Sequence, residues 1–368
     1  MDDLSIGLLL PSSSIMPMGK QYSKGFKKGL KEAMGDAADE VEIIPEMTGN
    51  GSFVNLDKAM DKLFGYHGVD AVAGLSSAFV LANITDRFKK EKVPMVCGNL
   101  GEHYQPIDEF NEYVFLNSEY FWHQCWLMGR YAAQNVGKKG TVITAMYDSG
   151  YAFSISFQLG MQSASPDVIP DFHLMSMPPD GALSNMDEVF EKVNFDEYDF
   201  ALVLFCGEEA AQFLEGVKSR GLQDKLAIFG LPFLLESGKE DLDGMEVYTS
   251  MRNAYPNQED IRHQKVFTQL GVSSGKAIGE AMVTDGGRPT LESIHEVLEK
   301  MDGERIYKSE DLGQITGPVS IIKNRFVKGN EIESERIAEV SSDLAEDAAL
   351  AMARSGMASS WMNPYLGV

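Results

Sequence analysis

Short apolar runs rich in β-branched residues alternate with amphipathic stretches along most of the chain, and this alternation constrains the fold more than any other feature. Strands that are apolar throughout are typical of a parallel sheet covered on both faces by helices. The runs expected to be strands are 4–10, 41–44, 69–73, 93–97, 113–116, 141–146, 172–175, 200–205, 226–229 and 245–249. The stretches with helical spacing are 19–34, 55–64, 79–90, 121–135, 152–161, 186–193 and 208–220, with two or three further helices after residue 252. The fold class is therefore predicted to be α/β.

The series of strands and helices starts again after residue 116, which predicts a second sheet. A chain of 368 residues is long enough for two or three packed units. No proline- or serine-rich linker separates the halves, so we expect them to touch along a cleft. A hairpin-like segment, 317–329, is the one clear signal for two antiparallel strands.

The charge balance argues against some partners. The chain has 55 acidic and 32 Lys and Arg residues, a formal net charge of −23, which repels phosphate backbones and anionic lipid headgroups. Nucleic acid is thus not an expected partner. The three cysteines, Cys97, Cys125 and Cys206, cannot all be paired within one chain because their number is odd. The first strand begins at Leu4, which leaves no room for a leader, so the protein is expected to be cytosolic or to have had a leader removed.

Motifs that usually indicate catalysis were not found. The first strand ends in Pro11 and three serines instead of a glycine-rich dinucleotide loop, and no phosphate loop, nucleophile elbow or zinc-binding helix is present. The six histidines are scattered, and none has another at a spacing of three or four residues. The sequence therefore predicts no catalytic residue, no metal site and no cofactor.

The loops that follow the strands carry the more informative residues, because open α/β sheets bind ligands at the carboxyl ends of their strands. Ser76 and Ser77 offer hydroxyl and backbone N–H groups to an anion, although capping of the next helix explains either serine equally well. The loop 98–101 would lie beside them, either as a close backbone approach to a ligand or as a plain turn. In the second half, Tyr151 occupies a similar place and is expected to close on a ligand or simply to pack.

The order of these segments resembles the type I periplasmic binding fold, in particular the branched-chain amino-acid (Leu/Ile/Val) binding proteins of ABC transporters. The resemblance covers nearly the whole chain and rests on Ile6 to Pro11, Met18-Gly19, Gly25, Gly74 to Ser77, Val93 to Cys97, Tyr147 to Tyr151, Asp199 to Val203, Val217 to Leu222, Gly317-Pro-Val and Lys328-Gly329.

This resemblance implies two doubly wound Rossmann-like lobes that close on a ligand by hinge motion. It places residues 1–117 and 250–330 in the first lobe and 118–249 and 331–368 in the second, with hinge crossovers near Asn117, Thr249 and Asn330. It assigns ligand contacts, with the carboxylate held by the first lobe and the side-chain pocket bordered by its Met18; the residues involved are Met18, Ser76, Ser77, Asn99, Leu100, Gly101, Tyr151, Cys206 and Phe233.

Phe233 departs from the family pattern. Amino-acid receptors of this class typically have an acidic residue at the matching position, where it pairs with the ammonium group of the ligand. A buried ammonium without a counter-charge is unfavourable by several kcal/mol. Unless Glu208 or Glu236 substitutes, the sequence favours a more apolar or aromatic carboxylate over an ordinary amino acid.

The resemblance implies a non-enzymatic receptor, periplasmic or lipid-anchored, that delivers a small carboxylate-bearing ligand to the membrane permease of an ABC transporter. The alternative is a sensor that uses the same fold to regulate a partner without a transporter. Residues 341–368 continue past the usual end of the family and are expected to form a helix that docks on the second lobe or contacts a partner.

Overall fold

The computed structural model describes residues 4–13, 16–102, 110–146, 148–168, 171–176, 184–236, 242–252, 265–300, 306–307, 318–328 and 331–341. These residues fall into two compact units, and the first holds those of 4–119 and 265–307 while the second holds those of 120–252 and 318–341. No helix in the described part of the chain is both long enough and apolar enough to cross a membrane.

The first unit contains a sheet that has, within the described residues, six strands in the order β11-β5-β4-β3-β1-β2. The strands β1 to β5 are parallel, and β11 is antiparallel to β5. The strand bounds are β1 Ser5–Leu10, β2 Glu42–Met47, β3 Ala71–Leu75, β4 Met95–Asn99, β5 Val114–Ser118 and β11 Ile306–Tyr307. The helices are α1 Met18–Met34, α2 Phe53–Lys62, α3 Ala78–Ala82, α4 Thr85–Glu91, α9 Val266–Asp285 and α10 Leu291–Lys300, with short helical turns η1 Gly35–Glu40 and η2 Leu63–His67.

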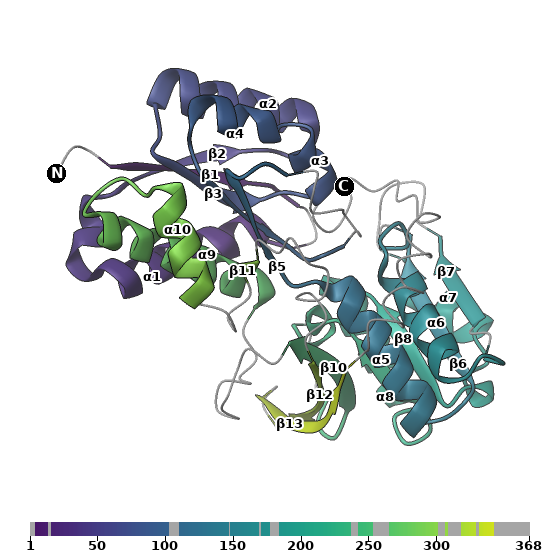
Figure 1. Cartoon of the computed structure of the whole chain (residues 1–368). Helices are drawn as coiled ribbons and strands as arrows, with labels where there is room; N and C mark the ends of the chain where they lie inside the picture. Colours follow the sequence, from purple (N-terminus) through teal and green to yellow (C-terminus); the bar gives the residue numbers. More distant parts are fainter. Residues whose placement is uncertain are drawn as a thin grey trace. The chain divides into compact units, whose positions relative to one another are not determined.

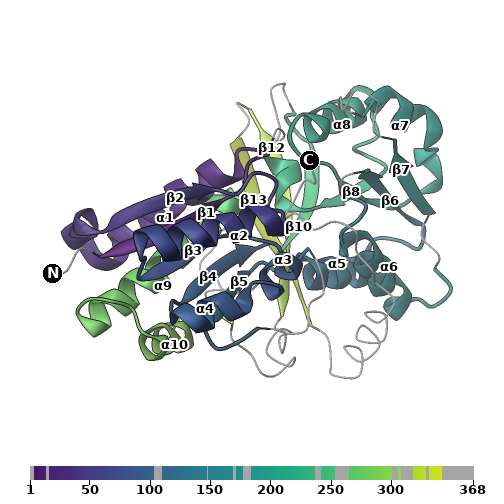
Figure 2. The ribbon, with the colours of Figure 1, turned by 90° about the horizontal axis from the view of Figure 1, so that it is seen from above.

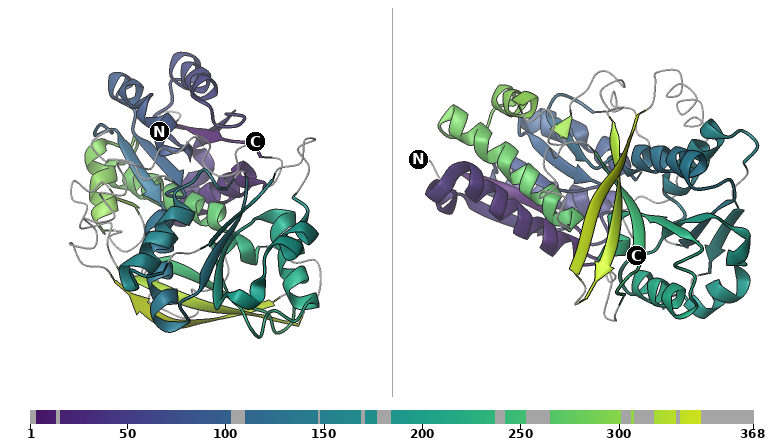
Figure 3. Two further views of the ribbon diagram at one scale, coloured as in Figure 1. Left: turned by 90° about the vertical axis from the view of Figure 1, so that its right-hand side faces the viewer. Right: turned by 90° about the horizontal axis from the view of Figure 1, so that it is seen from below.

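Helices cover both faces of this sheet, as the apolar strands require. Figure 1 shows α2 and α4 on one face and α1, α9 and α10 on the other. The first face buries a core that includes Leu56 and Met60 of α2, Phe88 of α4 and Val72 and Met95 of the strands. On the second face α1 and α9 lie side by side (Figure 3), and glycines bring the two backbones close together.

The second unit has a sheet of seven strands among the described residues, in the order β13-β12-β10-β9-β8-β6-β7. Its strands are β6 Gly140–Ala145, β7 Asp171–Met175, β8 Phe200–Leu204, β9 Ala227–Gly230, β10 Glu246–Arg252, β12 Val319–Val327 and β13 Glu331–Val340. Its helices are α5 Phe121–Asn135, α6 Phe153–Ala164, α7 Met186–Lys192 and α8 Gly207–Ser219, with short turns η4 Phe195–Glu197 and η5 Pro232–Leu235. Within this unit α5 and α6 cover one face of the sheet and α7 and α8 the other (Figure 2).

The two units confirm the α/β class with two parallel-rich sheets, and the structure differs from the expected pattern in two places. The expected helix 79–90 is two helices, because the chain turns at Asn83, whose side-chain amide donates to the Phe79 carbonyl at 2.7 Å. The expected hairpin 317–329 contains a single strand, β12, whose antiparallel partner is β13.

The position of the strand β12 changes the expected boundary between the two units. It forms an antiparallel ladder with β10, from Val319 opposite Arg252 to Arg325 opposite Glu246, and therefore belongs to the second sheet. The boundary expected at residue 330 would have left this strand in the first lobe. Likewise β10 continues beyond Thr249 as a strand of the second unit. Gly317, Gly329, Asn330 and the segment 342–368 of the expected extension lie outside the described residues.

Candidate functional site

The loop after β3 contains the two expected serines, both buried. The Ser77 hydroxyl oxygen accepts a hydrogen bond from the Val80 backbone N–H at 3.3 Å, so Ser77 caps α3. The Ser76 hydroxyl donates to the Ser77 carbonyl at 3.2 Å. Helix capping therefore explains the presence of a serine at position 77. The hydroxyl of Ser76 contacts only the backbone of the next residue.

Replacement of Ser77 by alanine should lower the free energy of unfolding by about 1 kcal/mol, because the Val80 N–H loses its acceptor in a buried place. Ser76→Ala, which removes no bond to a helix N–H, is the matched control. Urea unfolding of the two variants measures the difference, and equal midpoints would refute the capping role.

The loop after β4 lies beside these serines because β3 and β4 are neighbouring parallel strands. The Asn99 side-chain oxygen accepts from the Gly101 N–H at 3.0 Å, and Gly101 has a φ of 63°, a conformation that glycine adopts without strain. Leu100 is buried in the same turn. Met18, the first residue of α1, is also buried and follows β1 at the same sheet edge. All six expected residues of the first unit thus lie at the carboxyl ends of β1, β3 and β4.

Glu102 is a residue of this loop that the sequence analysis missed. Only 1% of it is exposed; its Oε2 accepts from the Leu100 N–H at 3.1 Å, and its Oε1 has no hydrogen-bond partner among the described residues. Burial raises the pKa of this carboxyl to about 8, and the bond from Leu100 offsets only part of that rise. The loop therefore carries a mostly protonated, neutral carboxyl at pH 7.

In the second unit, the expected residues follow three neighbouring strands. Tyr151 follows β6, Cys206 follows β8 and Phe233 follows β9, and β8 pairs with both other strands. All three side chains are buried. The three cysteines of the chain, all described, form no disulfide.

A series of aromatic rings connects Tyr151 to Phe233. The ring centroids are 5.6 Å apart from Tyr151 to Phe153, 6.3 Å from Phe153 to Phe121 and 6.1 Å from Phe121 to Phe233. Phe121 begins α5 and Phe153 begins α6, so two helix starts bring the rings together. We refer to these four residues as the aromatic cluster. It gives this edge of the second sheet an apolar, aromatic character.

Two further acids that the sequence analysis missed lie at the same sheet edge. Asp148 follows β6 and is 0% exposed, and neither of its carboxylate oxygens has a hydrogen-bond partner among the described residues. Glu209, in the first turn of α8, is buried, and its Oε1 accepts from the Ser184 N–H at 2.6 Å. Burial first, and then the nearby charge of Glu209, raise the pKa of Asp148 well above its ordinary value. Glu208 and Glu236, the acids considered from sequence, are each only partly buried.

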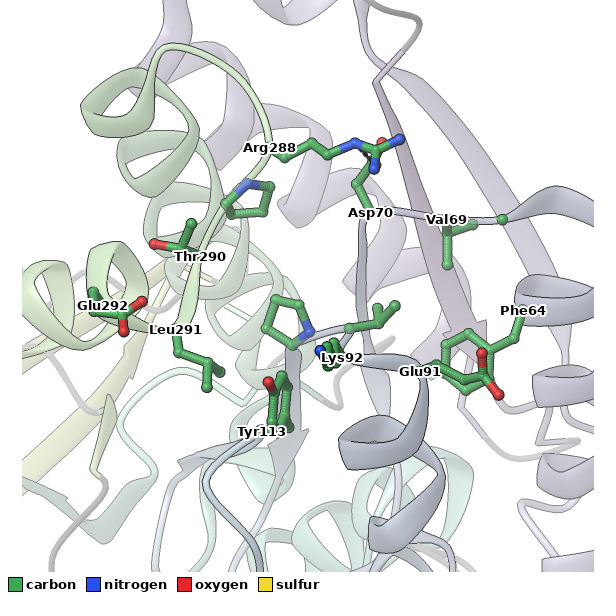
Figure 4. Close-up of a pocket in the computed structure, with 14 residues that line it drawn as sticks. Phe64, Val69, Asp70, Glu91, Lys92, Tyr113, Arg288, Thr290, Leu291 and Glu292 are labelled. Atoms are coloured by element: carbon green, nitrogen blue, oxygen red, sulfur yellow. Dashed lines mark ion pairs between the residues drawn. The ribbon is translucent and has the colours of Figure 1, made fainter.

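A pocket of about 560 Å³ lies at the opposite edge of the first sheet, near the amino ends of β3 and β4 (Figure 4). Arg288, which is 71% exposed, pairs with the buried Asp70 through an Nε to Oδ1 distance of 2.5 Å, and Asp70 also accepts from the Ser5 N–H at 2.8 Å. Lys92, Glu91 and Glu292 add one cation and two acids to the lining. The mixed charges, already paired at Asp70, select no single class of ligand.

Comparisons with known proteins agree with this fold. The family model described as "Periplasmic binding protein" matches residues 3–314. No curated protein matches the chain in sequence.

Solved structures show the same fold at low sequence identity. A solute-binding protein of an ABC transporter from Rhodopseudomonas palustris BisB5, in complex with 3,4-dihydroxybenzoic acid, has a TM-score of 0.65 and 15% identity over 93% of this chain and 99% of that chain. The leucine-binding protein LivK from Thermotoga maritima has a TM-score of 0.63 and 16% identity over 92% and 98%. LivJ from Streptococcus pneumoniae, in complex with isoleucine, has a TM-score of 0.63 and 15% identity over 93% and 99%.

The family match covers most of the chain, and it confirms both the resemblance seen in the sequence and the expectation of a solute receptor in place of an enzyme. The protein belongs to the periplasmic binding protein family.

Proposed function

We propose that the protein is the extracytoplasmic solute receptor of an ABC transporter and that its ligand is a small carboxylate with an apolar or aromatic body. Family membership supports the receptor role. The observation that supports the apolar or aromatic body is the aromatic cluster, which ends at Phe233. Among the proteins with this fold, some bind hydroxylated benzoic acids and others bind leucine or isoleucine.

In the first unit, the loops after β3 and β4 are the proposed carboxylate subsite. The Ser76 hydroxyl, which donates to the Ser77 carbonyl, and the Leu100 N–H, which donates to Glu102, lie at one sheet edge, and an incoming carboxylate would replace these two acceptors. Glu102 does not oppose an incoming anion at neutral pH, because its raised pKa keeps it mostly protonated. The subsite is thus polar without a fixed negative charge.

A thermal-shift screen of dialysed protein tests this function. A ligand present at 100 times its dissociation constant stabilises the folded state by about 2.7 kcal/mol, which raises the melting temperature measurably. We expect shifts with benzoate, 4-hydroxybenzoate, 3-phenylpropionate or 4-methylpentanoate, with or without an added amino group, and none with the matching neutral amides such as benzamide. If none of these carboxylates raised the melting temperature, the proposed function would be overturned.

Asn99→Asp locates the carboxylate subsite. An aspartate oxygen can still accept from the Gly101 N–H, so the turn is retained while a negative charge is added beside the ligand's own. We expect at least a tenfold loss of affinity for any carboxylate found in the screen. Asn185→Asp is the control, because Asn185 caps α7 by accepting from the Asp187 N–H and the change adds the same charge elsewhere. Equal affinity in both variants would place the carboxylate away from Asn99.

A further inference from the structure

One edge of the second sheet is open to a further strand. The strand β7 is the last in the strand order, and no described strand pairs with its outer side (Figure 1). An edge strand presents a row of backbone N–H and C=O groups to which another strand can bind. On β7 this row is accompanied by two large apolar side chains, because Phe172 is 44% exposed and Leu174 is 41% exposed. The edge therefore offers both backbone hydrogen bonds and an apolar contact.

The exposure of these two side chains follows from the position of α6. Phe172 lies beside Val142 of β6, and Leu174 is two residues further along on the same face. Gly140 is on that face as well, and a Cβ added to it would lie 2.5 Å from the Met161 side chain of α6. The helix therefore packs over β6 and leaves the apolar side chains of β7 exposed.

The other three sheet edges in the described part of the chain carry features that hinder pairing with a further strand. The strand β11 has only two residues. The strand β2 contains Pro45, which has no N–H group to donate. The strand β13 has four exposed glutamates, which are Glu331, Glu333, Glu335 and Glu339. By contrast, β7 has no lysine, arginine or proline, and its one carboxylate, Asp171 at the start of the strand, accepts from the Tyr198 hydroxyl at 2.6 Å.

The sequence of β7 is complementary to itself when two copies of the strand run antiparallel. With His173 opposite His173, each Phe172 lies opposite a Leu174 on one face, and each Asp171 lies opposite a Met175 on the other. Cross-strand pairs of large side chains are a main source of stability in a sheet. A contact about a two-fold axis requires such complementarity, because both partners use the same surface. The strand therefore fits a second copy of itself.

We propose that β7 is the contact through which two copies of this chain associate, by antiparallel pairing of the two strands about His173. The net charge of −23 makes two copies repel each other, so such a contact has to lie on a surface with little charge, as the β7 edge does. Pairing would join the two second sheets into one continuous sheet. The inference does not depend on the proposed function, because the candidate-site loops of this unit follow β6, β8 and β9 and not β7.

The contact is small, and this sets the expected strength of the association. Two strands of five residues are too short to bury the roughly 1,200 Å² of a standard interface, so we expect a weak dimer that forms at high protein concentration. Salt should strengthen it, because salt screens the repulsion between two chains of like charge. Sedimentation velocity of the full chain at about 5 to 500 µM, in low and in high NaCl, should show a mass that rises toward that of two chains, and further in high salt. A monomer under every condition would overturn the proposal.

A pair of complementary charges tests the partner and the register together. Phe172→Glu and Leu174→Lys each place a charge opposite an apolar side chain in both halves of the contact, so each variant alone should remain monomeric. In an equal mixture, the new acid of one copy faces the new ammonium of the other, and an unchanged Phe172 meets an unchanged Leu174, so the dimer should return. Val54→Glu is the control, because Val54 is a 56% exposed apolar residue of the first unit, and this variant should associate like wild type. A mixture that stays monomeric would refute the pairing about His173.

A cysteine at the two-fold axis tests the same geometry covalently. In an antiparallel pair, the Cα atoms of opposed residues are about 4.5–5.5 Å apart, which is within the range that a disulfide spans. His173→Cys should therefore form a disulfide-linked dimer under mild oxidation, since the three native cysteines are buried. Tyr66→Cys is the control, because Tyr66 is 84% exposed in the first unit and has no reason to meet its own copy. Equal yields of linked dimer from the two variants on non-reducing gels would contradict the proposed contact.

Discussion

Glu102→Gln should stabilise the protein strongly at alkaline pH and hardly at all at pH 4. The folded-state pKa of Glu102 is about 8, against an ordinary value of 4.5 for the unfolded chain. Below pH 4.5 the carboxyl is protonated in both states and contributes no difference. Between pH 4.5 and 8 the unfolded chain loses the proton and the folded chain keeps it, so the free energy of unfolding falls by about 1.4 kcal/mol per pH unit. The full loss, reached above pH 8, is at most about 5 kcal/mol.

The glutamine removes this loss because an amide has no charge to bury, and its side-chain oxygen can still accept from the Leu100 N–H. Urea unfolding at pH 4, 6 and 8.5 measures the difference between the two proteins. Glu112→Gln is the control, because Glu112 is half-exposed and pairs with Lys89. Parallel pH profiles for wild type and Glu102→Gln would show that Glu102 ionises normally in the folded state. The same titration should weaken carboxylate binding in wild type above pH 8, because an ionised Glu102 repels the ligand at the loop after β4.

Gly25→Ala should destabilise the protein by about 3 kcal/mol or more, since it places a methyl group against backbone that cannot move aside. An added Cβ at Gly25 would lie 2.0 Å from the Thr268 carbonyl oxygen of α9, and one at Gly271 of α9 would lie 2.2 Å from the Tyr22 carbonyl oxygen of α1. The glycines of the two helices therefore interlock, and a methyl group on either one forces the helices apart.

Gly65→Ala is the matched control, because Gly65 has no atom within 4 Å of an added Cβ. Alanine is favoured over glycine in helical backbone by up to about 1 kcal/mol, so this variant should be neutral or slightly stabilised. Thermal unfolding of both variants beside wild type provides the measurement. Equal melting temperatures for Gly25→Ala and wild type would mean that α1 and α9 can move apart without loss of stability.

The sequence predicts the regular elements well where local pattern determines them. The helix expected at 121–135 is α5, Phe121–Asn135, and β8 and β9 lie within one residue of the expected strands. The break between α3 and α4 was missed because it depends on one side-chain bond of Asn83 to the backbone, which leaves the helical spacing of the apolar residues intact. The pairing of β12 with β10 was missed because the two strands are separated by more than sixty residues that include two helices of the other unit.

In the candidate site, too, local pattern predicted some residues, while others depend on contacts between distant segments. The loops after β3, β4 and β6 were identified because strand ends can be read from local pattern. Glu102 and Asp148 resemble ordinary loop acids in the sequence, and only the packing around them reveals that they are buried. The one signal in the sequence is that Asp148 closely follows the predicted end of a strand. This position alone does not show whether the acid is solvated or buried, because burial depends on the rest of the fold.

The segmented construction of both units has a consequence for synthesis on the ribosome. Thr268, which packs against Gly25, follows it by more than 240 residues, and β10 must await β12, some 70 residues later. At about 5–20 residues per second, α1 remains without its partner helix for about 12–50 s after it emerges. Neither unit can therefore complete its core until most of the chain has been made. During this interval the nascent protein is incompletely folded, and an incompletely folded chain can pass through a narrow pore.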